Sequence, residues 1–163
     1  MSQVELLEED LSGGAIEQIW QYSRENKTRI NPVHISDQIS MTPPLTRIQP
    51  DVVISVNLLN QLDIFLCDYL GKLGHFQPES FHPLRTAIQA FHLEWISLKP
   101  GCLVTDTTEE VVTKKGDLSS KALLHTDLPG GIRHDCWWWD FDSQGTYHRE
   151  SRTRMEVQAV EWT

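Results

Sequence analysis

The sequence of 163 residues lacks any apolar run that approaches the roughly 18 residues needed to cross a bilayer. It has three cysteines, Cys67, Cys102 and Cys136, and no CxxC pair among them. An odd number of widely spaced cysteines argues against a disulfide framework and a zinc ribbon, so we expect reduced thiols. The start, MSQVELLEED, is acidic and has no apolar signal core, which makes the cytoplasm the expected compartment.

Basic residues are also scarce, because 14 Lys and Arg face 23 Asp and Glu and leave a net charge of −9 at pH 7. Such a charge repels a phosphate backbone unless the basic residues gather on one face. Arg149, Arg152 and Arg154 do cluster, but Glu150 and Glu156 are interleaved with them, which indicates a solvated strand face. We therefore do not expect nucleic-acid binding.

The length favours a single domain over residues 1–163 with one substantial core. Two short β-branched segments organise it: DVVISVN at 51–57 and LKPGCLVTDT at 98–107. A helical pattern fills the space between them, which predicts a strand, helices and a second parallel strand in an α/β sheet. Ligands of such sheets bind beyond the carboxyl ends of the strands, and the polar residues there are Ser55, Asn57, Thr105 and Asp106.

The segment 51–56 is apolar at four of six positions, which predicts a strand buried on both faces at the centre of the sheet. The other patterns predict a strand at 4–11, a helix at 15–25, an irregular crossover at 28–50, and helices at 58–73 and 83–98. On the last of these helices we expect His92 to lie at the surface or its boundary. Residues 109–127 show a weak helical period.

The C-terminal residues predict a closing antiparallel hairpin at the sheet edge, from an aromatic strand at 137–141 and an alternating strand at 153–162. The run Trp137, Trp138 and Trp139 is open to two interpretations, a stacking platform for a base or sugar, or packing. Alternation places Trp137 and Trp139 on one face, so we expect at least one tryptophan in the core.

At this point the order of elements resembles the later two-thirds of a class I S-adenosylmethionine-dependent methyltransferase. The matching residues are Glu8-Glu9-Asp10-Leu11, the DVVISVN segment, Leu98-Lys99-Pro100-Gly101 before a strand, and the hairpin at 137–162. That family has a seven-stranded sheet whose last strand is antiparallel and hairpinned to the sixth. The resemblance implies a Rossmann-like, mostly parallel sheet with a C-terminal antiparallel hairpin, and S-adenosylmethionine as the cofactor.

The sequence departs from the family in lacking its Gly-rich cofactor loop and its second strand. Ser12-Gly13-Gly14 is too short to replace the loop and follows the wrong strand. We therefore expect an N-terminally incomplete domain of doubtful activity. In the family the first strand lies beside the fourth, so its absence exposes an edge of the strand at 51–56. A homodimer through this edge, or poor solubility, is the expected consequence.

The resemblance also implies site residues. Asp10 and Leu11 would border the adenine, and Ser55, Val56 and Asn57 would lie along the cofactor near the transferred methyl. The alternative is that Asp10 caps the following turn and Asn57 caps the following helix. No catalytic residue is assigned, because transfer from a sulfonium mainly needs alignment and desolvation. A general base could come from His125, Asp127 or His134.

Two other function classes stay open. His125 with Asp127, and His134 with Asp135 and Cys136, offer metal ligands within a short span, but neither spacing matches a known zinc pattern, so we assign no metal. The other class is a non-catalytic α/β interaction module whose incomplete cleft serves as a binding surface. The substrate, small molecule or protein, cannot be identified from the variable segments at 28–50 and 107–136.

Overall fold

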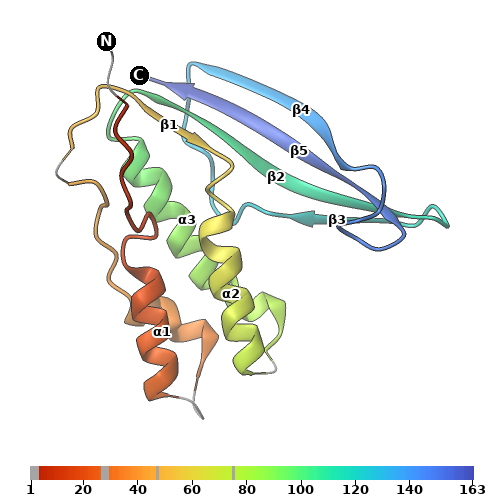
Figure 1. The fold of residues 1–163 in the computed structure, drawn as a ribbon, viewed down its shortest axis with the longest axis horizontal. Coiled ribbons are helices and arrows are strands. Elements are labelled where there is room, and N and C mark those ends of the chain that lie inside the picture. The colour runs from red at the N-terminus through yellow and green to blue at the C-terminus, as the bar shows by residue number, and fades with distance from the viewer. Residues whose placement is uncertain (1–3, 27–29, 47, 75) are drawn as a thin grey trace.

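The computed structural model describes residues 4–26, 30–46, 48–74 and 76–163. Its helices gather beneath one edge of a twisted sheet, and the long strands extend beyond them (Figure 1). The helices are α1 (Ala15–Glu25), α2 (Gln61–Leu73) and α3 (His82–Ile96), with short 3₁₀ turns η1 (Pro32–Gln38) and η2 (Pro78–Phe81). The strands are β1 (Val53–Val56), β2 (Gly101–Thr113), β3 (Leu118–Ala122), β4 (Arg133–Asp142) and β5 (Ser151–Trp162).

The sheet has the order β1-β2-β5-β4, and β3 pairs with β2 as well. β1 and β2 are parallel, with Val53 opposite Gly101, and α2 and α3 form the crossover between them. The pairs β2–β3, β2–β5 and β4–β5 are antiparallel. The chain is therefore a mixed α/β fold, but the open sheet is mostly antiparallel, and the expectation of a mostly parallel sheet is wrong.

The predicted parallel strand pair is confirmed, but β1 is not the buried centre of the sheet. Within the described residues β2 is the single strand that pairs with β1. Ile54 is 71% exposed and Val56 is also exposed, because these side chains point away from the helices. The strand expected at 4–11 does not form either, and Leu6 in this segment is 92% exposed. An apolar segment without a neighbouring strand has no partner for its backbone groups.

β2 continues to Thr113, where a weak helix was expected over 109–127. Val111, Val112 and Thr113 are β-branched residues that suit a strand, and the hairpin to β3 turns at Gly116, which has a φ of 88°. The register of β2 against β5 shifts between Asp106 and Thr108. This segment is therefore a β-hairpin, and the helical expectation is wrong.

The C-terminal antiparallel hairpin of β4 and β5 is confirmed. Trp137 pairs with Val157 and Trp139 with Met155, so the two tryptophans share a face as expected. Trp137, Trp138 and Trp139 are each about 43–44% exposed. The expectation that one of them belongs to the core is therefore wrong, because β4 lies at an edge of the sheet.

The helices α1, α2 and α3 agree with the predicted segments, and the 28–50 region contains η1 in its described part. One core cluster joins α1, α2, α3 and the 3₁₀ turns through Ile19, Ile35, Leu70 and Ile88 among others. A second cluster joins the end of α3 to the sheet, and it contains Leu93, Ile96, Leu103, Val160 and Trp162. None of the helices in the described ranges combines the length and apolar character of a membrane span.

Candidate functional site

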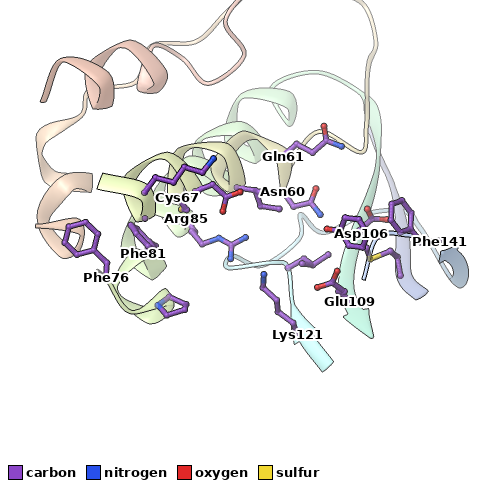
Figure 2. Close-up of a pocket in the computed structure, with 18 residues that line it drawn as sticks. Asn60, Gln61, Cys67, Phe76, Phe81, Arg85, Asp106, Glu109, Lys121 and Phe141 are labelled. Atoms are coloured by element: carbon purple, nitrogen blue, oxygen red, sulfur yellow. The ribbon is translucent and has the colours of Figure 1, made fainter. Parts of the chain in front are cut away.

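A cleft of about 790 Å³ lies between α2, the start of α3 and the strands β2 and β5 (Figure 2). Its apolar walls come from helices and sheet together, and its ionisable groups come from separate elements and loops. The lining residues include Asn60, Gln61, Ile64, Cys67, Asp68, Gly71, Lys72, Phe81, Arg85, Asp106, Glu109, Lys121, Leu123, Phe141, Tyr147 and Met155. A concave, mostly apolar space with a few converging polar groups is the usual form of a ligand site.

A buried ion pair fixes the helical wall of this cleft. Asp63 of α2 accepts hydrogen bonds from Arg85 Nε and, at 3.1 Å, from Gln89 Nε2, both on α3. Gln89 also donates to the carbonyl of Leu123 at 3.0 Å and accepts from the backbone N–H of His125 at 2.8 Å. The network therefore ties α2 and α3 to the segment that follows β3.

Burial dominates the electrostatics of this wall. It raises the pKa of Asp63, and the attraction of Arg85 offsets that effect only in part. It also raises the pKa of the Cys67 thiol to about 12, with a further contribution from the negative charge of Asp63. Since the thiolate is the nucleophilic form of cysteine, Cys67 is unreactive at neutral pH.

Acidic residues of β2 and an ordered loop form the opposite wall. Burial raises the pKa of Asp106, and its Oδ1 is buried with no hydrogen-bond partner among the described residues. Glu109 lies 3.2 Å from His148 Nε2. Asp142 accepts backbone hydrogen bonds from Gly145 at 3.0 Å and Tyr147 at 2.5 Å, which holds the loop that carries Tyr147 to the cleft.

Two histidines meet beside Arg85. The Nδ1 atoms of His82 and His125 are 3.0 Å apart, so one ring donates and the other accepts. Burial lowers the pKa of His125 to about 4, and the charges of Arg85, His82 and Lys121 contribute to this lowering. The imidazole of His125 is therefore neutral at pH 7, in a region where positive charge accumulates.

The five residues implied by the resemblance lie outside the lining of this cleft. Asp10 precedes α1, and its carboxylate accepts from the N–H groups of Ser12 at 2.9 Å and Gly14 at 3.1 Å. This is the turn-capping role that the sequence left open as the alternative. Leu11 is half-buried in the same turn.

Ser55 points into the core beneath β1, where its hydroxyl lies 3.0 Å from His92 Nε2. His92 is only 1% exposed, so the expectation of a surface or boundary position is wrong. Its ring occupies the α3 face that packs on β1, and burial lowers its pKa to about 4. Val56 is exposed on the other side of β1.

Asn57 has a left-handed backbone, with a φ of 52°, directly after β1. Its N–H donates to the carbonyl of Val104 at 2.8 Å, which extends the parallel ladder by one residue. Its side-chain Oδ1 is buried and, in the part of the chain described here, has no hydrogen-bond partner. Because α2 begins at Gln61, Asn60 occupies the N-cap position and Asn57 does not cap this helix. Asparagine is one of the few residues other than glycine that adopt this conformation readily.

Of the four polar residues proposed at strand ends, Asp106 alone lines the cleft. The most buried cation of the site, Arg85, was not identified from the sequence. The sequence does contain a pattern that indicates its burial. Arg85 lies four residues after Phe81 and three before Ile88, on the apolar stripe of α3. An arginine on such a stripe needs a buried partner, which Asp63 supplies.

Two of the residues considered as metal ligands make other contacts. Asp135 forms an ion pair with Arg133 at 2.8 Å, and Cys136 Sγ lies 3.7 Å from Glu156. Within the described ranges, no group of three or more His, Cys, Asp or Glu side chains is placed to hold a metal ion. Comparisons of the chain with known protein families, curated proteins and solved structures found no match.

Proposed function

We propose that this chain is a non-catalytic α/β binding module that takes a small polar ligand in the cleft between α2 and the sheet. The observation that carries the proposal is the buried, unpaired hydrogen-bonding capacity at this cleft. Arg85 Nη2 and Asp106 Oδ1 come from opposite walls, and both are buried without a partner among the described residues. Such groups cost free energy unless a ligand or water pairs them.

The non-catalytic interpretation follows from the chemistry of the same groups. The Cys67 thiol is held protonated by its raised pKa. The hydroxyl–imidazole pair of Ser55 and His92 is buried beneath β1, and neither residue belongs to the cleft lining. The cleft therefore offers binding groups, and among the described residues that line it no nucleophile is paired with a base.

A screen of small polar molecules by ¹H–¹⁵N NMR tests this proposal. Gly71 lines the cleft, and a β-carbon added to it would meet no atom within 4 Å, so Gly71→Phe fills the cleft without a backbone clash. Gly71→Ala is the matched control. We expect ligands that shift cleft resonances in the Ala variant and lose binding in the Phe variant. Ligands that bind both variants equally, or no ligand at all, would contradict the proposal.

A second candidate is a Rossmann-like, methyltransferase-like domain that binds S-adenosylmethionine. The parallel β1–α2–α3–β2 crossover and the last strand running antiparallel beside β2 favour it. So does the left-handed Asn57 at the carboxyl end of β1 with its unpaired Oδ1 in the described structure. In this proposal Ser55, Val56 and Asn57 lie near the cofactor, and Asp10 and Leu11 border its adenine.

Calorimetric titration with S-adenosylhomocysteine separates the two candidates. Asn57→Gly keeps the left-handed backbone and removes only the amide side chain, so it is the suitable control variant. Micromolar binding that is lost in this variant and kept in Gly71→Phe supports the methyltransferase-like candidate. The absence of heat up to millimolar ligand removes it and leaves the binding module.

A further inference from the structure

We infer that the ligand of the cleft is a small monocarboxylate with an apolar body, and that Arg85 and Lys121 hold its carboxylate. The inference rests on the binding function proposed above and adds the chemical class of the ligand. It concerns the end of the cleft where α3 meets the segment after β3.

The guanidinium of Arg85 is buried and already oriented by the protein itself. The residue is 9% exposed, and its Nε donates a hydrogen bond to Asp63. This bond fixes the direction of the guanidinium. Nη2 is buried and has no partner in the described part of the chain. A planar guanidinium has donors besides Nε, and such donors match the oxygens of a carboxylate. Asp63 is itself fixed by Gln89, so the arginine does not have to be ordered when the ligand binds.

Lys121 adds a second cation from the sheet side. Its backbone lies opposite Glu109 in the β2–β3 ladder, and its side chain lines the same cleft. It belongs to none of the ion pairs found within the described residues. The side chains of Arg85 and Lys121 point toward the same part of the cleft in Figure 2. The positive charges of both act on Cys67 and on His125, which places them around one region. Cations from two elements therefore converge there.

The remaining walls select the rest of the ligand. Phe81 and Ile64 on the helical side, and Phe141, Leu123 and Met155 on the sheet side, offer an apolar lining. Asp68, Asp106 and Glu109 also line the cleft, so the ligand's one carboxylate is held at Arg85 and Lys121 and a second negative charge is repelled. A monocarboxylate with an aromatic or aliphatic body fits this distribution better than a polyanion does.

The test is an NMR titration of the full chain with phenylacetate and hexanoate, each compared with its uncharged amide. We expect the Kd of each acid to be about tenfold lower than the Kd of its amide. This is the difference in affinity that one additional charge-assisted hydrogen bond supplies. Lys121→Gln weakens acid binding about threefold, as expected for a partly solvated charge pair, and the exposed Lys115→Gln is the matched control. Acid binding also raises the pKa of His125, because a nearby carboxylate favours the imidazolium.

Three results would overturn the inference: amides that bind as tightly as their acids, a Lys121→Gln variant with unchanged acid affinity, or no binding by either acid. In each case the screen on the Gly71 variants still decides the proposed function by itself. Uncharged or cationic ligands that bind and are blocked by Gly71→Phe keep the binding module and remove the carboxylate. Failure of every ligand removes both.

Discussion

His92 gives the sharpest physical prediction of this structure. Its ring is 1% exposed, its Nε2 lies 3.0 Å from the Ser55 hydroxyl, and its Nδ1 is buried without a partner among the described residues. Burial lowers the pKa of His92 from 6.5 to about 4. Acidification must therefore protonate this histidine in the unfolded chain before it does so in the folded protein.

The sign and size of the effect follow from this difference. A histidine whose folded pKa is depressed contributes its full stability above pH 6.5, and that stability is lost as the pH falls toward about 4. One pKa unit corresponds to about 1.4 kcal/mol, so the difference between the unfolded and folded pKa values of His92 lowers the free energy of unfolding by about 3 kcal/mol at pH 4. The magnitude is a large share of the stability of a domain of this size.

Urea unfolding followed by tryptophan fluorescence, at several pH values between 7 and 4, measures this loss. His92→Gln keeps a polar partner for Ser55 but has no proton to gain, so its stability is expected to fall by about 3 kcal/mol less over the same range. His134→Gln, which changes an exposed histidine of β4, is the control. Parallel pH profiles for wild type and His92→Gln would refute the reasoning.

Three further predictions concern stability and association. Asp63→Ala leaves the buried Arg85 charge unpaired and is expected to lower the free energy of unfolding by about 3–5 kcal/mol in urea titrations; a loss below about 1 kcal/mol would contradict a buried pair. Gly101→Ala places a methyl group against a β1 carbonyl and is expected to lower the free energy of unfolding by at least about 1 kcal/mol. Gly71→Ala in α2 is expected to raise it by about 0.5–1 kcal/mol. Thermal melts of the two variants measure this difference. If the open edge of β1 forms a homodimer, sedimentation shows association that rises with concentration and that Ile54→Lys abolishes, and a wild-type monomer at high concentration counts against it.

The elements predicted correctly are those with a strong local pattern. α1, α2 and α3 follow the apolar spacing of a helix, and the residues at their ends stop them close to the expected positions. The alternation at 153–162 predicts β5, and the aromatic segment at 137–141 before it predicts the hairpin with β4. These patterns act between residues close in sequence, so one chain displays them directly.

The errors arise where distant residues decide the structure. The weak helical period after Glu109 is overridden by pairing with β3 and β5, because strand pairing supplies hydrogen bonds that local propensity does not reveal. The apolar pattern of β1 predicts a central strand, but in the described structure β1 has one neighbouring strand. The number of neighbours of a strand is a property of the whole sheet.

The candidate site shows the same division. The parallel strand pair and its helical crossover follow from the amino-acid order, because they depend on local periodicity and on the general geometry of parallel strands. Asp106 was expected at the carboxyl end of its strand, but it lies inside β2, which continues to Thr113. That Asp106 shares a cleft with Arg85, and that Asn57 lies outside it, follows only from the packing of the elements in space. This juxtaposition depends on how α2 and α3 lie against the twisted sheet, which no short stretch of sequence specifies.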